Sequence, residues 1–351
     1  MCNIAGYVGE RRAAPVLLEM LRRQEDFDGG LCAGIATIYE GRIYTRKICG
    51  SVDDLIRHTD ALYLPGNIGI AHTRPGGDPL TFNFAHPFPT PDETMVGITN
   101  GTAPFQKYYE DTQRVTDMLE DAGYKFRGEA FGVGETKFPK VKNGANVSCV
   151  ETRTNYVHYL YNQGMSMTAA MAKMAVDCYT DSVFGALNVA TPDRFYILRT
   201  TRPAISLKAD DGVYLATTRF AFPDGLRGEV KQLPVMYPCE ITRDGVTVSN
   251  DKMTGCEEIS EITDYTLEEG YNRIVNLLKG KKDSPLYFDN LELAVGKDMR
   301  DLFPGDHSLI QHARLVYDVL WRLTEEGRLK TERRLFKNFT NLHRTYMWID
   351  D

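Results

Sequence analysis

A chain of 351 residues, 42% hydrophobic and 25% charged, has the balance of a globular protein and the length of one large or two ordinary domains. Its formal net charge of -7 and its lack of a long basic run argue against a nucleic-acid partner. No stretch approaches the roughly 18 uninterrupted apolar residues of a membrane span, and the first residues lack the basic-then-apolar order of a signal peptide. We therefore expect a cytoplasmic protein with no membrane partner.

The first cysteine has an unusual position, directly behind Met1 and at the head of a strand-like stretch at residues 2–9. The small side chain of Cys2 should let an aminopeptidase remove Met1, which would leave one residue carrying both a thiol and a free α-amine. The other six cysteines are scattered and form no C-x-x-C pair, a pattern unlike a disulfide framework or a zinc cage. We expect no metal and no cofactor.

The first hundred residues alternate between a predicted helix and predicted strands. After the opening strand, amphipathic spacing predicts a short helix at residues 11–23, and apolar segments around Glu40–Gly41 predict a β-hairpin. Two further strand-like runs, at residues 67–74 and 94–101, end in polar residues and glycine. We therefore expect polar side chains that could take part in catalysis or binding to lie at the ends of these strands.

The rest of the chain has three regions with different predicted secondary structure. A helix is predicted over 104–123, a long loop over 128–146, and a methionine-rich helix over 165–179. Residues 194–248 then contain several strand-like runs and an Asp-Gly hairpin signal. From residue 264 onward apolar residues recur at helical spacing, which predicts a helical extension.

Three polar features form a candidate catalytic constellation. In a terminal Cys2 the α-amine (pKa near ~8) can act as a base beside the thiol (pKa near ~8.5). Arg74 offers a planar fork for a carboxylate, while the Asn100 amide and the Gly101 N–H can face a developing oxyanion. Each of these residues taken alone has a simpler interpretation. Arg74 could form a surface ion pair, and Asn-Gly is a common turn dipeptide.

Taken together, these residues resemble the class II glutamine amidotransferases, which are N-terminal-nucleophile hydrolases, and most closely the glutaminase domain of glucosamine-6-phosphate synthase. The family's C-G-I-x-G-Y-x-G, G-H-T-R-W, N-A-H-P and H-N-G motifs have counterparts here, and two further stretches echo the same domain. The matching stretches, which fall within roughly the first 245 residues, are CNIAGYVG (2–9), AHTRP (71–75), FAHP (84–87), TNG (99–101), GYKFRGE (123–129) and LATTRFAFPD (215–224).

The resemblance implies roles for single residues. Cys2 would attack a side-chain amide and shuttle the proton through its own amine, while Asn100 and Gly101 form the oxyanion hole and Arg74 grips the substrate carboxylate. Thr73 and His86, which lie in the matched motifs, are the further residues assigned to substrate binding.

The implied fold is α+β, a four-layer αββα sandwich with a C-terminal helical extension. We expect an amidotransferase-like domain over 1–263 and the extension over 264–351.

One position departs from the family in the sign of its charge. The family's S-E-T-D-T-E-V motif, whose aspartate binds the α-amino group of glutamine, appears here as CVETRTNYV, so Arg153 occupies the aspartate's position. Either Glu151 or an acidic residue of the 128–146 loop contacts the amine, or the substrate carries an acyl group or a second carboxylate there, with Arg153 as its partner. We favour the first because Arg74 is preserved.

Three functional hypotheses follow. The first is a glutamine amidotransferase or glutaminase subunit that releases ammonia for a separate synthase, because the residues after 264 are too few for the acceptor domain of the relative named above. The second is an N-terminal-nucleophile amidohydrolase acting on another amide selected by Arg74 and Arg153. The third is a non-catalytic binding protein on the same fold.

Overall fold

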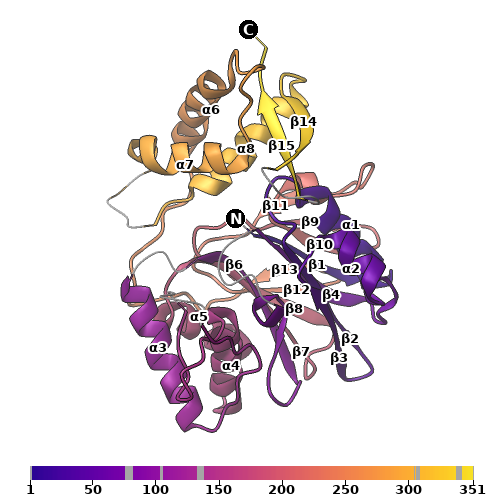
Figure 1. Cartoon of the computed structure of the whole chain (residues 1–351), viewed down its shortest axis with the longest axis vertical. Helices are drawn as coiled ribbons and strands as arrows, with labels where there is room; N and C mark the ends of the chain where they lie inside the picture. The colour runs from indigo at the N-terminus through magenta and orange to yellow at the C-terminus, as the bar shows by residue number, and fades with distance from the viewer. Residues whose placement is uncertain are drawn as a thin grey trace.

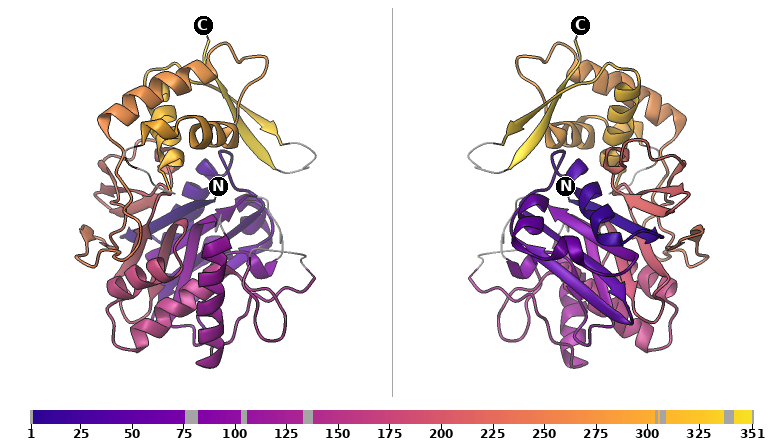
Figure 2. Two further views of the ribbon diagram at one scale, coloured as in Figure 1. Left: turned by 90° about the vertical axis from the view of Figure 1, so that its left-hand side faces the viewer. Right: turned by 90° about the vertical axis from the view of Figure 1, so that its right-hand side faces the viewer.

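The structure is a computed structural model that describes residues 2–75, 82–102, 106–132, 138–303, 305, 309–336 and 342–350. Two antiparallel β-sheets lie face to face with helices on their outer sides, and a smaller C-terminal unit sits at one end of this sandwich (Figure 1). The amino terminus lies where the two parts meet, as both side views show (Figure 2).

The first sheet has seven strands in the order β11-β9-β10-β1-β4-β2-β3. Every pairing in it is antiparallel. Its strands, in chain order, are β1 (Asn3–Gly9), β2 (Cys32–Tyr39), β3 (Arg42–Ile48), β4 (Ile68–Arg74), β9 (Ile205–Ala209), β10 (Gly212–Ala216) and β11 (Glu229–Gln232).

The second sheet has six strands in the order β13-β12-β8-β7-β6-β5, again antiparallel throughout. Its strands are β5 (Phe88–Pro89), β6 (Met95–Thr102), β7 (Asp181–Asn188), β8 (Arg194–Arg199), β12 (Cys239–Thr242) and β13 (Gly245–Val248).

Side-chain alternation along the strands builds the core between the sheets. Ile4 and Val8 of β1 and Ile68 and Ile70 of β4 meet Val96 and Ile98 of β6 and Phe195 of β8 in one buried cluster. Complete burial of such a side chain contributes about 1.5–3 kcal/mol. The intervening residues of each strand point outward to the helices, so both faces of each sheet are covered.

The helices complete the outer layers. On the seven-stranded sheet lie α1 (Ala13–Gln24) and α2 (Val52–His58), joined to it by a buried cluster that includes Leu17, Leu21 and Leu55. On the six-stranded sheet lie α3 (Gln106–Asp121), α4 (Cys149–Asn162) and α5 (Met167–Asp177). Four short 3-10 helices, η1 (Ala61–Tyr63), η2 (Phe82–Phe84), η3 (Arg219–Ala221) and η4 (Arg300–Leu302), lie in the connections.

The C-terminal unit begins with α6 (Asp264–Leu278), at the residue where helical spacing predicts the extension to start. It continues with α7 (Phe288–Asp298) and α8 (His312–Glu325), whose apolar faces share one buried cluster. A hairpin of β14 (Lys330–Leu335) and β15 (His343–Trp348) follows, and the sequence did not predict it. The extension is therefore mixed in structure rather than helical throughout.

The four-layer αββα arrangement agrees with the predicted α+β fold. The hairpin at Glu40–Gly41, the strands at β4 and β6, and the methionine-rich helix α5 all form where they are predicted. Pro104 lies outside the described residues, as do residues 133–137 of the predicted loop. Within the described ranges, no helix has the length and apolarity needed to cross a membrane.

Candidate active site

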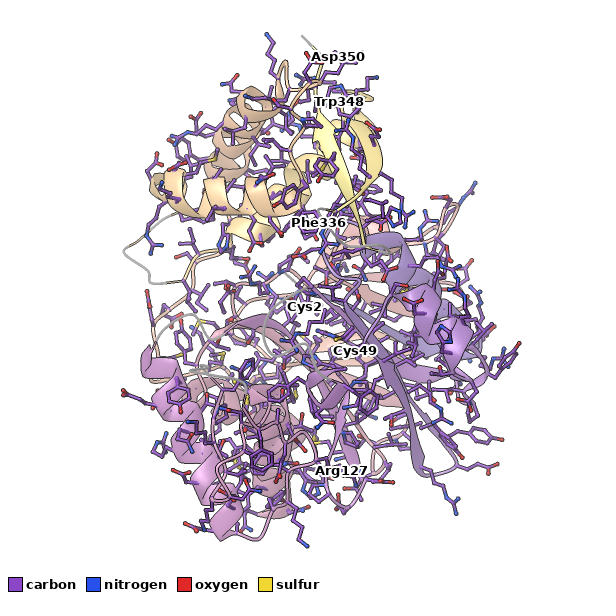
Figure 3. The ribbon with its side chains drawn as sticks, viewed as in Figure 1. Cys2, Cys49, Arg127, Phe336, Trp348 and Asp350 are labelled. Atoms are coloured by element: carbon purple, nitrogen blue, oxygen red, sulfur yellow. The ribbon has the colours of Figure 1, made fainter. Side chains whose placement is uncertain are left out.

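A row of four side chains crosses one end of the seven-stranded sheet. Asn3 of β1 pairs with Thr73 of β4, and Cys32 of β2 pairs with Arg74, so Cys2 and Cys32 flank Arg74 on its two neighbouring strands. Cys49 stands next to Cys32, with 3.6 Å between the two sulfur atoms. Figure 3 labels Cys2 at this end of the sandwich, under the C-terminal unit, with Cys49 beside it. Because side chains alternate between the two faces of a strand, Cys2 and Arg74 point into the space between the sheets, as Ile4 and Ile70 do.

The six-stranded sheet supplies the opposing groups. Asn100 continues the inward-facing positions of Val96 and Ile98 on β6 and is completely buried. Among the described residues neither its Oδ1 nor its Nδ2 has a hydrogen-bond partner. A buried amide without partners is costly unless a bound group satisfies it, so Asn100 is available to a ligand.

The residue after Asn100 must be glycine. Gly101 has φ +141°, and a Cβ there would lie 2.0 Å from the carbonyl oxygen of Asp181. The Gly101 N–H lies close enough to the Cys2 sulfur to lower the pKa of the thiol. Cys2 and the Asn100–Gly101 pair therefore lie near each other on the two facing sheets.

Burial and the nearby positive charges shift the pKa of the Cys2 thiol in opposite directions. Burial raises the pKa of the thiol, while the positive amino terminus, Arg74, the Gly101 N–H and Arg202 each lower it. Arg74 also donates a hydrogen bond of 3.4 Å to the Phe84 carbonyl oxygen. Burial is the larger effect, so the pKa of the thiol stays above its usual value and a base is needed to take its proton.

Two neutral imidazoles lie beneath these cations. His72 and His86 stack with their ring centroids 3.9 Å apart, and both are buried. Burial first, and then the charge of Arg74, lowers the pKa of His72 to about 3. Burial first, followed by the charges of His72, Arg74, Lys47 and Arg153, holds the pKa of His86 well below its usual range. Both rings are therefore uncharged at neutral pH.

Thr73 does not join this group. Strand alternation turns it to the helical side of the sheet, where its Oγ1 accepts a hydrogen bond of 2.8 Å from the Gly30 N–H. The contact holds the turn that follows α1. The expectation that Thr73 contacts the substrate is therefore not supported by its position, whereas His86 does lie beside Arg74 and Arg153.

Helix α4 contributes a carboxylate and a guanidinium with different partners. Glu151 accepts hydrogen bonds from two backbone N–H groups, that of Arg127 at 2.6 Å and that of Gly128 at 2.8 Å, so both of its oxygens hold the loop. Arg153 is 3% exposed, and its Nε has no hydrogen-bond partner among the described residues. The structure gives no support to Glu151 as the group that receives a substrate amine.

The C-terminal unit reaches the residue next to the nucleophile. The Asn3 amide donates to the carbonyl oxygens of Gln24 and Asp28, and the Tyr317 hydroxyl of α8 donates to its Oδ1 at 3.4 Å. Asn3 replaces the glycine of the family motif, and its side chain ties β1 to α8. The sequence alone gave no signal for this contact.

An ion-pair network also joins the two parts. Arg202, which lies beyond the end of β8, binds Asp181 of β7 at 2.6 Å and also binds Glu292 of α7. His312 of α8 lies 3.2 Å from Glu292. Burial disfavours the charged form of Glu292, but Arg202, His312 and the amino terminus together hold its pKa well below the usual range. Glu292 is thus an ionised group near the start of β1.

Comparisons with known proteins agree with the resemblance that the sequence motifs indicate. No family model matches the chain. The chain is 30% identical over 286 residues to glutamine–fructose-6-phosphate aminotransferase (isomerizing) of Pyrococcus horikoshii, which covers 76% of the chain and 41% of that relative. It is 27% identical over 219 residues to the enzyme of the same name from Clostridium acetobutylicum, covering 62% of the chain and 31% of the relative. The chain thus spans less than half the length of these curated relatives.

A solved structure shares the fold. Glutamine phosphoribosylpyrophosphate amidotransferase from B. subtilis, complexed with ADP and GMP, matches 96% of this chain and 68% of its own, with a TM-score of 0.58 and 14% identity. At that identity the likeness is one of fold alone.

Proposed function

This chain is related to the class II glutamine amidotransferases through the glutaminase domain of glutamine–fructose-6-phosphate aminotransferase, and on that premise we propose that it releases ammonia from a glutamine-type side-chain amide. Cys2, with Met1 removed, is the nucleophile, and its own α-amine is the base. One observation carries the proposal: the Gly101 N–H lies close to the Cys2 thiol, and the neighbouring buried Asn100 amide has no hydrogen-bond partner among the described residues.

The reaction proceeds in two steps. The α-amine takes the thiol proton, and the sulfur attacks the carboxamide carbon, whose oxygen becomes an oxyanion between Asn100 and Gly101. The protonated amine then gives its proton to the leaving nitrogen, so that ammonia departs and an acyl thioester on Cys2 remains. Water attacks the thioester with the amine again as base, which releases the acid and regenerates the thiol. Arg74 binds the carboxylate of the substrate.

We infer that the ammonia goes to an acceptor bound by a synthase domain or subunit. The relatives named above are aminotransferases acting on glutamine and fructose 6-phosphate, and the present chain covers less than half of each. Support for a partner comes only from this relation, and without the partner the chain should act as a simple glutaminase-type hydrolase.

The test measures ammonia release by the purified chain after mass spectrometry has established that Met1 is absent. We expect Cys2→Ala to lower the rate by at least about a thousandfold, because no other group supplies the nucleophile. Cys256→Ala is the matched control, since it removes a half-buried thiol that lies outside this row and should leave the rate unchanged. A mature chain that keeps Met1, or a Cys2→Ala variant as active as the wild type, would refute the proposal.

A further inference from the structure

A buried guanidinium at the site lacks an anionic partner. Arg153 lies on α4 with 3% of its surface exposed, and it forms no hydrogen bond or ion pair with any described residue. Burying a charge without a partner is strongly unfavourable, so such groups are found where a ligand completes them.

The guanidinium of Arg153 acts on groups that belong to the candidate site. Its charge acts on the His86 imidazole and on the Cys149 thiol, and the charge of Arg74 acts on the same two groups. Arg74 in turn acts on the Cys2 thiol. Helix α4, which carries Arg153, packs against β5 and against β6, the strand that carries Asn100. The two guanidiniums therefore act on the same buried groups of the candidate site.

The acidic groups nearby are already engaged. Both oxygens of Glu151 accept backbone N–H donors, and Asp181 and Glu292 both bind Arg202. Lys47 adds a further cation on the side of His86, where its ammonium donates to the Ala85 carbonyl oxygen at 2.9 Å. Among the described residues, no free carboxylate faces this region to receive the ammonium of free glutamine.

We propose that the substrate is an ω-carboxamide with a carboxylate for Arg74 and a second, uncharged or anionic oxygen acceptor for Arg153 where glutamine carries its ammonium. An acyl oxygen on the α-nitrogen and a second carboxylate both supply this acceptor, and a guanidinium can bind either of them. An ammonium at the same place meets a like charge in a partly desolvated site, which disfavours it. This inference rests on the proposed function, because it concerns the substrate of the same nucleophile.

The experiment compares four amides that differ only at this position. They are glutamine (ammonium), glutaramate (hydrogen), N-acetylglutamine (acyl oxygen) and (2-carbamoylethyl)malonate (carboxylate). For the wild type we expect kcat/KM to be about ten- to a hundredfold higher for the better of the two oxygen-bearing amides than for glutamine. Which of the two is better identifies the source of the acceptor oxygen.

Variants at position 153 test whether the arginine sets this order. Arg153→Gln should remove the preference, Arg153→Lys should restore part of it, and Arg153→Asp should favour glutamine, with the change mainly in KM. Arg227→Asp, which makes the same charge change at an exposed arginine before β11, should leave the preference intact. A wild type that turns over glutamine best, or an order of preference that Arg153→Gln does not alter, would overturn the inference.

Binding to the inactive Cys2→Ala variant separates the two proposals. Calorimetry on this variant should show the oxygen-bearing amides binding about ten- to a hundredfold more tightly than glutamine, and the added Arg153→Gln change should abolish that difference. If no amide yields ammonia with the wild type while this binding order holds, the proposed function fails and the specificity of the site stands. If ammonia is released from glutamine with equal or better binding, the reverse is true.

Discussion

Asn100 and Gly101 are adjacent on β6, yet they act through different parts of the residue. Asn100 offers its side-chain amide, because strand alternation turns that group into the space between the sheets. Gly101 offers its backbone N–H, because its positive φ and its close approach to Asp181 leave no room for a side chain. In the proposed reaction, this one dipeptide presents two donors to the same reacting oxygen.

Replacement of Asn100 by alanine should lower kcat by about a hundred- to a thousandfold, because one oxyanion donor is lost while substrate binding through Arg74 remains. Steady-state kinetics of ammonia release provide the measurement. Thr99→Val is the matched control, since the Thr99 side chain points to the opposite face of β6 and its replacement should keep kcat within about threefold. An Asn100→Ala variant with near-normal kcat would exclude this amide from the oxyanion hole.

At the scale of elements, a hydrogen bond to a titratable carboxyl group joins the end of α1 to the start of α2. Glu25 follows the last residue of α1, and its Oε2 accepts a hydrogen bond of 3.0 Å from the N–H of Val52, the first residue of α2. Burial raises the pKa of Glu25 to about 7, although the Val52 N–H opposes this effect. The folded protein therefore holds a proton that the unfolded chain has already released at neutral pH.

This link predicts a loss of stability as the pH rises from about 4.5 to about 7, the range in which only the folded protein keeps the Glu25 proton. The contribution of Glu25 is complete below its unfolded pKa of about 4.5 and declines as the pH rises through about 7. Glu25→Gln keeps the neutral form, so between pH 5 and pH 8 the wild type should lose roughly 2–3 kcal/mol of unfolding free energy relative to this variant. Denaturant unfolding at the two pH values measures the difference.

Glu19→Gln on the exposed face of α1 is the control and should follow the wild type at both pH values. Parallel pH dependences of the wild type and Glu25→Gln would show that the Glu25 carboxyl does not titrate in this range.

At the scale of the whole molecule, the C-terminal unit and the sandwich share buried charge. Arg202 is 8% exposed and holds one carboxylate from each part, Asp181 from β7 and Glu292 from α7. The β14–β15 hairpin adds contacts on the other side, where the Thr345 N–H donates to the Asp26 carbonyl oxygen at 2.8 Å and Arg344 lies 3.5 Å from Asp28. The C-terminal unit is therefore joined to the end of the sandwich that carries Cys2.

Replacement of Arg202 by methionine should cost about 3–5 kcal/mol of unfolding free energy, because two buried carboxylates lose their counter-charge. The control is Arg273→Met, which removes exposed ion pairs to Glu269 and Asp301 within the C-terminal unit and should change the unfolding free energy little. Denaturant unfolding monitored by circular dichroism compares the two variants. Equal, small losses would mean that the Arg202 network does not hold the parts together.

The amino-acid sequence by itself determined many of the elements and the candidate residues of the site. Local signals suffice for the hairpin at Glu40–Gly41 and for the alternation of β4 and β6, because both depend on residues close in the chain. Motif spacing likewise identified Cys2, Arg74 and Asn100 without any knowledge of the fold.

Only the tertiary structure decided which side chains meet. Strand register turned Thr73 away from Arg74, two loop N–H groups occupied Glu151, and α8 brought Tyr317 to Asn3 across more than three hundred residues of chain. Such contacts depend on the packing of distant segments, which no local pattern encodes. The burial of Arg153 without a partner among the described residues belongs to the same class, because it depends on which groups the folded chain places around the guanidinium.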